Sequence, residues 1–300
     1  MTSRTLSKAA TFALLLVAAA GLLLWWRASP ERAAPTTSRR LVSLAPNITE
    51  TLFELGVGDE VVGVTTYCNY PPAAKTRQKV GDFINPSIET IASLQPDLVL
   101  MEKWTSSKTA RRLGQLGLPC EETISPMSLA EVYQQISEVG KAVHRQPEAE
   151  RLIAEMKRRV EAVRARASRL AYHPSVYVEI DPPSWTVGRG SYTSEAIALA
   201  GGRSLFDDLQ RPASLVSKEE VVKRNPDVIL SFWARAPEIR ARTGWQNVRA
   251  VRQGWIIDDF NRDLLSRGTF RLVEGIEQLA KRLEAMGIEK QSASVRGRFR

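Results

Sequence analysis

The sequence predicts an α/β protein made of two related lobes that are joined by one long helix. The first observation is a repeat, because residues 87–100 (SIETIASLQPDLVL) and 217–230 (SKEEVVKRNPDVIL) follow the same plan 130 positions apart. The second is a long helical pattern between the two copies, starting at Pro147. The third is composition: 43% hydrophobic and 25% charged residues in a chain of 300 are typical of a soluble protein with a substantial core.

Each copy of the repeat has the pattern of a helix that leads into a buried strand. Ser87 and Ser217 are suited to cap the helix starts, and Glu89 and Glu219 fall in the first turns, where the helix dipole favours a carboxylate. A Pro-Asp pair then ends the helix, and the apolar run after it fits a strand covered on both faces. One such copy is common in α/β proteins, but two copies in one register indicate two related lobes.

Residues 1–40 predict an export segment followed by a tether. Residues 9–26 are almost wholly apolar and follow Arg4 and Lys8, which is the charge pattern of an export signal. The stretch is just long enough to span a bilayer, and Trp25-Trp26 are typical of an interfacial anchor. We therefore expect an exported, extracytoplasmic protein whose N-terminal segment contacts the membrane, with cleavage of that segment left open.

Strand and helix patterns alternate through the first lobe, which we place at residues 41–146. The predicted strands are 41–44, 61–64, 98–101 and 118–124, and the predicted helices are 48–55, 87–95, 106–116 and 128–145. Tyr67 follows the second strand and Trp104 follows the third. Because α/β sheets bind ligands beyond the carboxyl ends of their strands, both are candidates for a ligand cleft; the alternative is that they only pack their loops.

The connecting helix, residues 147–171, leads into a second lobe at residues 172–287. At 1.5 Å per residue this helix spans roughly 36 Å, enough to cross from one lobe to the other. The second lobe is predicted to contain strands 175–180, 228–232 and 255–257 and helices 194–200, 218–225 and 269–286. Helix 194–200 is similar to helix 49–55, with Glu195 in the place of Glu50. The basic tail, residues 288–300, is expected to be solvated and without fixed structure.

Other classes of function find little support in the sequence. The excess of nine positive charges comes largely from the chain ends and the central helix, without an aromatic-interleaved basic motif, so nucleic-acid binding is not expected. Gly-x-Ser-x-Gly and Walker A motifs are absent, and His144 and His173 alone do not make a histidine zinc site. We expect neither an enzyme nor a bound cofactor or metal. Whether Cys68 and Cys120 form a disulfide is left open.

These segments together resemble a known family. Residues 41 to about 286 resemble the substrate-binding proteins of ABC importers for cobalamin, haem and iron-siderophores. This is the helical-backbone metal-receptor type of periplasmic binding protein, with two Rossmann-like lobes joined by a single long backbone helix. The segments that carry the resemblance are LVSLAPNITETLFELGVGDEVVGVT, TYCNYPP, VGDFINPSIETIASLQPDLVL, WTVGRGSY, SKEEVVKRNPDVIL and SRGTFRLVEGIEQLA. Thr269-Phe270 depart from the family pattern, where many relatives carry Gly-Pro, and so does Phe83, where a Trp occurs.

The resemblance implies a monomeric binding protein that delivers a small ligand to an ABC permease dimer. In such importers one glutamate on each lobe docks into arginine pockets of the permease, and the matching positions here are Glu89 and Glu219. The alternative for both residues is that they only favour their helix dipoles, which is compatible with docking. A membrane-anchored sensor of the same fold remains a further alternative, whereas a hydrolase lacks a visible nucleophile–base pair.

The ligand implied by the resemblance is a cobalamin-like corrinoid, because the TYCNYPP loop is most similar to the cobalamin binders. Haem or an iron-siderophore is the alternative, since Tyr67 carries a phenol that can ligate haem iron and arginines can hold an anionic chelate. A large flat ligand requires aromatic walls and a few polar groups that orient it. The residues expected to line the cleft are Tyr67, Phe83, Trp104, Asp181, Trp185, Trp233, Asp258, Phe260 and Arg262.

Overall fold

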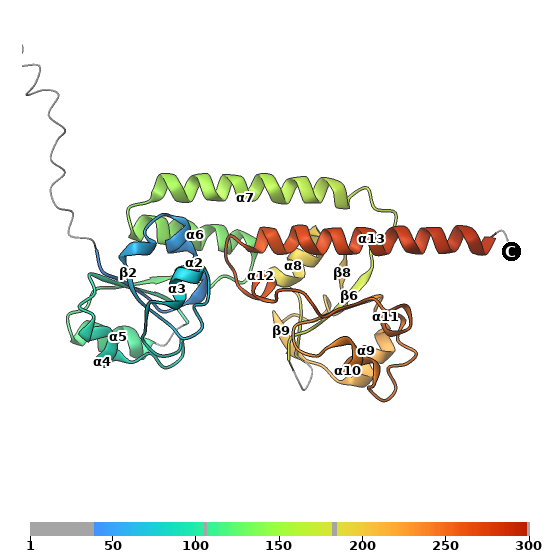
Figure 1. Cartoon of the computed structure of the whole chain (residues 1–300), viewed down its shortest axis with the longest axis horizontal. Helices are drawn as coiled ribbons and strands as arrows, with labels where there is room; N and C mark the ends of the chain where they lie inside the picture. The colour runs from blue at the N-terminus through green and yellow to red at the C-terminus, as the bar shows by residue number, and fades with distance from the viewer. Residues whose placement is uncertain (1–38, 105–106, 182–184, 299–300) are drawn as a thin grey trace, which may run out of the picture. The chain divides into compact units, whose positions relative to one another are not determined.

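The computed structural model describes residues 39–104, 107–181 and 185–298, and Arg40–Arg300 form one compact unit. Two α/β lobes with parallel sheets make up this unit (Figure 1). The predicted export segment and most of its tether lie outside the described residues. No described helix combines the length and the apolar composition that a membrane crossing requires.

The two sheets share one strand order. The first lobe holds five parallel strands in the order β3-β2-β1-β4-β5, and the second holds four in the order β11-β10-β6-β8. Read from the other edge, β8-β6-β10-β11 repeats β2-β1-β4-β5, so the two related α/β lobes expected from the sequence are confirmed. The strands are β1 Leu41–Ser43, β2 Val61–Val64, β3 Gln78–Lys79, β4 Leu98–Glu102, β5 Cys120–Thr123, β6 Ser175–Glu179, β8 Arg203–Ser204, β10 Val228–Ser231 and β11 Ile256–Ile257.

The second lobe also carries a small antiparallel sheet that the sequence pattern did not predict. Its two strands are β7 Trp185–Val187 and β9 Ala213–Leu215. Short runs rich in Gly, Arg and Pro surround both strands, so their alternation is too brief to be recognised as a strand signal. This sheet forms part of one wall of the cavity described below.

Helices cover the sheets and connect the lobes. Those of the first lobe are α2 Pro46–Glu54, η1 Gly58–Glu60, α3 Pro72–Lys75, α4 Ile88–Ser93, α5 Ser107–Gln115 and α6 Leu129–Ala142. The connecting helix is α7 Gln146–Ala167, and those of the second lobe are α8 Tyr192–Leu199, α9 Lys218–Arg224, α10 Ala236–Arg240, α11 Arg249–Gln253, α12 Asp263–Ser266 and α13 Leu272–Arg298. Figure 1 shows α7 passing over both lobes, with α6 beside it at the first lobe and α13 beside it at the second.

The repeated stretch performs the same structural task in both lobes. The hydroxyls of Ser87 and Ser217 accept hydrogen bonds from backbone amides in the first turns of α4 and α9, as expected for N-caps. Asp97 then accepts from the Arg40 amide at 2.7 Å, and Asp227 accepts from the Ser175 amide at 2.9 Å. Each aspartate therefore attaches the start of β4 or β10 to the start of the neighbouring central strand.

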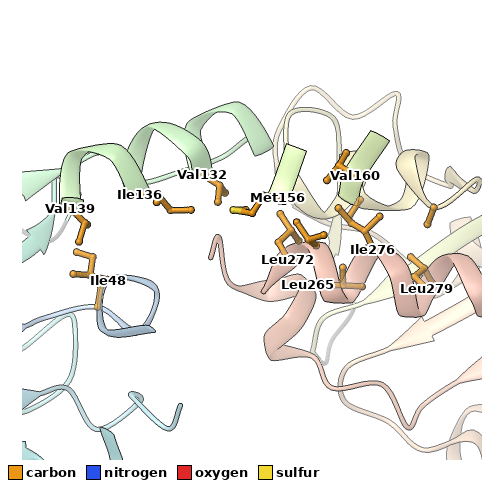
Figure 2. Packing of buried hydrophobic residues seen from close by; sticks show 14 of the residues in the cluster. Ile48, Val132, Ile136, Val139, Met156, Val160, Leu265, Leu272, Ile276 and Leu279 are labelled. Carbon is orange, nitrogen blue, oxygen red and sulfur yellow. The ribbon is translucent and has the colours of Figure 1, made fainter. Parts of the chain in front are cut away.

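A continuous apolar core joins the two lobes along the backbone helices. Val132 and Ile136 of α6, Met156 and Val160 of α7 and Ile276 of α13 belong to one buried cluster (Figure 2). Burial of such a shared cluster is the main source of stability between elements that are far apart in sequence. The lobes are thus held together by packing along one side, which restricts how far they can separate on the other.

The C-terminal end of the fold differs from the prediction. Helix α13 does not end near Met286 but continues to Arg298, so the expectation of a tail without fixed structure from residue 288 is wrong over that range. Residues 287–298 contain no proline, and a glycine such as Gly287 inside a helix costs only about 1 kcal/mol relative to alanine. The sequence therefore contains no signal strong enough to stop the helix there.

The two cysteines are both free thiols. Cys68 is buried after β2, and Cys120 begins β5. Three strand spacings separate β2 from β5 in the sheet, a distance of about 14 Å at the usual interval between strands. A disulfide needs Cα atoms within about 7 Å, so the fold keeps these two cysteines apart.

Candidate ligand-binding cavity

A cavity of about 700 Å³ lies between the two lobes. Part of its lining comes from residues that follow the ends of strands. Residues 45–47 follow β1, residues 125–127 follow β5, and Phe232 follows β10. The carboxyl ends of both parallel sheets therefore face this space, which is where α/β folds bind ligands. Its volume is in the range of small-molecule sites.

The first-lobe wall carries a row of three aromatic rings. The ring centroids of Tyr67 and Phe83 are 5.7 Å apart, and those of Phe83 and Trp104 are 5.4 Å apart, both in tilted or edge-on arrangements. Phe83 and Trp104 line the cavity directly, and Tyr67 continues the row beside Phe83. Trp104 is 58% exposed and Tyr67 is 55% exposed, so much of this aromatic surface is available for contact with a ligand.

Glu102 holds Trp104 in place. One carboxylate oxygen of Glu102 accepts from the Trp104 indole nitrogen at 2.7 Å, and the other accepts from Asn47 Nδ2 at 2.6 Å and Gln135 Nε2 at 3.0 Å. The Gln135 side chain also donates to the carbonyl of Ile124, at 2.7 Å. Three donors thus bind both oxygens of the acidic side chain of this wall and orient the indole ring.

The second-lobe wall combines the small sheet with α8 and the end of β10. Val187 and Ala213 are partners in the β7–β9 ladder, and both line the cavity. Because side chains alternate along a strand, Trp185 lies on the same face of β7 as Val187, although Trp185 itself is not among the lining residues. Tyr192 of α8 donates its hydroxyl to the Ser266 carbonyl at 2.7 Å, and burial raises the pKa of this phenol, so it acts as a neutral donor.

Arg267 is the basic residue of the lining, and both Nη atoms of its guanidinium have protein acceptors. Nη1 donates to Glu50 Oε1 at 2.8 Å and to Asn69 Oδ1 at 2.8 Å, and Nη2 donates to the Tyr67 carbonyl at 3.2 Å. Glu50 is 1% exposed, and burial raises the pKa of its carboxyl, although the hydrogen bond from Arg267 opposes the shift. The ionised groups of both walls are therefore bound to protein partners and do not project as free charges.

Comparison with known proteins identifies the class. The periplasmic binding protein family matches residues 41–261. The chain belongs to this family. A relative is an ABC transporter substrate-binding lipoprotein, YvrC, of Bacillus subtilis, which is 33% identical over 251 residues, covering 81% of this chain and 79% of the relative. Another is a vitamin B12-binding protein of Vibrio cholerae, 27% identical, covering 84% of this chain and 91% of that protein.

Solved structures confirm the two-lobed fold of this binding protein. The periplasmic haem-binding protein RhuT from Roseiflexus sp. RS-1 superposes with a TM-score of 0.75 at 28% identity and covers 83% of this chain and 99% of RhuT. The periplasmic vitamin B12-binding protein BtuF of Vibrio cholerae gives a TM-score of 0.70 at 25% identity, with 83% and 97% coverage. The resemblance found in the sequence is thus confirmed, and the expectation of a transport protein rather than an enzyme is confirmed by these relatives. Family membership also implies an extracytoplasmic location.

The structure brings only part of the predicted set of ligand residues to the cavity of this binding protein. Phe83 and Trp104 line it, and Tyr67 lies beside Phe83, whereas Trp185 is in β7 but not among the lining residues. Trp233 is 59% exposed and lies outside the lining, where the preceding residue, Phe232, takes the inward position. The ligand contacts assigned to all these residues stay predictions.

The remaining four residues of that set have other partners or positions. One carboxylate oxygen of Asp258 accepts from the Ala236 amide at 2.7 Å and so caps α10, while Phe260 packs on the shared apolar core. Arg262 is exposed at the start of α12. Asp181 forms a β-bridge with Trp185, and one of its oxygens is buried without a hydrogen-bond partner among the described residues. None of these four side chains lines the cavity.

Several lining residues were missed by reasoning from the sequence. They are Asn47, Glu102, Tyr192, Phe232 and Arg267. Glu102 and Phe232 could have been predicted, because each comes at the end of a predicted buried strand and α/β sheets bind ligands beyond the carboxyl ends of their strands. Arg267 gave no such signal, since its position depends on a buried partner, Glu50, that is 217 residues away.

The predicted docking glutamates occupy matching positions. Glu89 lies in the first turn of α4 and Glu219 in the first turn of α9, and both side chains are exposed. The two helices are the repeated stretch of the sequence, so each lobe presents one carboxylate at an equivalent place. Docking itself stays a prediction.

Two other features do not form a ligand site. A concavity of about 810 Å³ lies at the amino ends of β6, β8 and β10, whereas α/β sheets bind ligands beyond their carboxyl ends. Two of its four arginines are also paired internally, Arg224 with Asp208 and Arg249 with Asp227. Within the described residues there is also no group of three or more His, Cys, Asp or Glu side chains arranged to hold a metal ion. The cavity between the lobes is therefore the candidate site.

Proposed function

We propose that this protein captures a cobalamin-like corrinoid in the cavity between its lobes and delivers it to an ABC permease. The observation that carries the proposal is a cavity with aromatic walls in which both oxygens of Glu102 and both Nη atoms of Arg267 already have protein partners. Such a site favours a large flat ligand whose buried part is uncharged. The corrinoid is cargo, and the protein is proposed to work as a monomer without a cofactor of its own.

Charge separates the corrinoid from its competitors. The rim of a corrin ring carries neutral amides, whereas haem carries two carboxylates and many ferric siderophores are anionic. An anionic group placed in this cavity would meet no free guanidinium, because Arg267 is bound to Glu50 and Asn69. Burial of an unpaired charge is expensive, so the cavity disfavours such ligands.

The aromatic walls provide enough apolar contact for useful affinity. Burying about 300 Å² of apolar surface at about 25 cal/mol per Å² stabilises the complex by roughly 7.5 kcal/mol before the costs of association. Micromolar or tighter binding is therefore reasonable once those costs are subtracted. The vitamin B12-binding relative from Vibrio cholerae, similar over most of its length, gives further support.

Haem is the second candidate, and a specific observation favours it. Tyr67 is more than half exposed beside Phe83, so its phenol is accessible at the cavity and is a chemically suitable ligand for haem iron. The similar haem-binding protein RhuT also favours this candidate. An iron-siderophore is the remaining alternative.

Titration of the purified protein with cyanocobalamin, haemin and a ferric hydroxamate distinguishes these candidates. Isothermal titration calorimetry and quenching of tryptophan fluorescence are expected to show saturable 1:1 binding of cyanocobalamin and no comparable response to the other two. Absence of cyanocobalamin binding, together with a haem Soret shift that disappears in Tyr67→Phe, would overturn the corrinoid in favour of haem.

We further propose that residues 9–26 direct the protein out of the cytoplasm and contact the membrane, and that Glu89 and Glu219 dock onto the permease. The apolar sequence after Arg4 and Lys8 supports the first point, and the matching exposed positions of the glutamates support the second. The mass of the protein recovered from its native membrane or periplasm determines whether the segment is cleaved. Recovery of the full chain from the cytoplasm alone would contradict export.

A further inference from the structure

Two segments, residues 125–129 of the first lobe and 265–269 of the second, meet at the base of the cavity. Ser125, Pro126 and Ser266 are among the cavity-lining residues that they contribute. They touch each other at Gly268, where a Cβ atom would come within 2.7 Å of Pro126 Cγ. The spacing of the two cavity walls therefore depends on how these segments are held.

Glu50 of the first lobe holds the second-lobe segment. It projects from α2, and its two carboxylate oxygens accept separately from Arg267 Nη1 at 2.8 Å and Thr269 Oγ1 at 3.1 Å. Glu50 and Thr269 are each 1% exposed, so these hydrogen bonds are shielded from water. Arg267 extends the connection to the Tyr67 carbonyl, beside the aromatic wall.

The second contact has the lobes exchanged, because here Glu195 of the second lobe holds the first-lobe segment, residues 125–129. It projects from α8, and its Oε2 accepts from the Leu129 backbone amide at 2.7 Å. Leu129 is the first residue of α6, where an amide has no partner within the helix, while the Ser128 hydroxyl caps the amide of Glu131. A carboxylate from one lobe thus completes the helix cap of the other.

The two contacts are counterparts in the repeated fold. Helix α2 follows the central strand β1, and α8 follows the central strand β6 with only the short β7 between them. The two held segments lead into α6 and α13, the last helix of each lobe. We propose that Glu50 and Glu195 form a reciprocal pair of cross-lobe latches that position the two cavity walls for ligand binding. They are positioning residues, because neither lines the cavity and each acts through the segment that it holds.

The first test needs no ligand and uses hydrogen–deuterium exchange of the whole protein. Glu195→Ala in the second lobe is expected to speed exchange of the Leu129 amide in the first lobe by at least about tenfold, the effect of losing one charge-assisted hydrogen bond. Glu50→Gln in the first lobe is expected to speed exchange across residues 266–272 in the second. Glu54→Ala, on the exposed end of α2, is the control and is expected to change neither region. Unchanged exchange across the lobe boundary in Glu195→Ala would overturn the proposal.

The second test measures cyanocobalamin affinity and rests on the proposed function. Glu195→Ala, and Thr269→Val, which removes one hydrogen bond but no charge, are expected to raise the dissociation constant about tenfold. Glu195→Gln, which retains an acceptor for the Leu129 amide, is expected to restore affinity to within about threefold. Variants that lose only thermal stability and keep wild-type affinity would show a purely structural role and overturn the positioning proposal. If the wild type does not bind cyanocobalamin, the proposed function fails, while the exchange test still decides on the latches.

Discussion

The Arg112 guanidinium of α5 donates a hydrogen bond to the Glu89 carboxylate of α4, with 3.2 Å between Nη2 and Oε1. One of the two proposed docking carboxylates is therefore already paired in the free protein. Among the described residues, Glu219 on the other lobe forms no ion pair. The two lobes thus present glutamates at equivalent positions, one paired with an arginine and the other without an ion-pair partner among the described residues.

This asymmetry predicts that Arg112 competes with the permease for Glu89. Arg112→Ala is expected to strengthen docking modestly, by no more than about fivefold, because an exposed pair such as this contributes about 0.2–1 kcal/mol. Surface plasmon resonance of the protein over its permease in nanodiscs measures the change, with Lys75→Ala on the same lobe as the control. Weaker docking of Arg112→Ala would show that Arg112 itself contacts the permease.

Removing both docking carboxylates is expected to separate binding from transport. Glu89→Ala combined with Glu219→Ala leaves the cavity intact, so cyanocobalamin affinity should stay within about twofold of wild type while uptake is lost. Uptake of labelled cobalamin by cells or proteoliposomes with the permease is the measurement. Glu121→Ala, another exposed glutamate of the first lobe, serves as the control. Normal uptake by the double variant would remove the docking assignment.

The duplicated fold was predictable because its signals are local. The N-cap serines, the Pro-Asp pairs and the buried apolar runs each act within a few residues, and each forms the element expected of it. Even the matching positions of Glu50 and Glu195 were visible as a similarity between two helices. What that similarity did not show was that both side chains reach into the opposite lobe.

The cavity was less predictable because its lining depends on contacts that are distant in sequence. Asp258 has the position of a cleft residue at the end of a strand, but it accepts from the Ala236 amide and caps α10 instead. Trp233 and Phe232 are neighbours in sequence after the end of β10, and only the path of the folded chain there decides that Phe232, not Trp233, lines the cavity. Sequence reasoning found the correct strand ends but not the direction of each side chain.

The aromatic wall gives a direct test of ligand contact. Trp104→Ala removes a ring that lines the cavity and is expected to weaken cyanocobalamin binding about tenfold, since one ring contact contributes about 0.5–1.5 kcal/mol beyond its buried area. Trp233→Ala removes an equally exposed indole outside the lining and should change affinity less than twofold. Isothermal titration calorimetry compares the two variants. Equal losses would indicate a ligand that extends well beyond the cavity.

The two repeated aspartates predict unequal contributions to stability. Burial alone would raise the pKa of the Asp227 carboxyl, but hydrogen bonds from Tyr172, Ser175 and Arg249 outweigh burial and hold the pKa below its usual value of 3.8. A depressed pKa stabilises the fold above about pH 4, and this contribution is lost as pH falls through the folded-state pKa.

Asp227→Asn should therefore lower the free energy of unfolding by about 2 kcal/mol at pH 7, and by progressively less below pH 4. Asp97→Asn, at the matching but exposed position, should cost under about 0.5 kcal/mol. Urea unfolding at pH 7, 4 and 3 measures both, and a difference that grows on acidification would contradict the assignment.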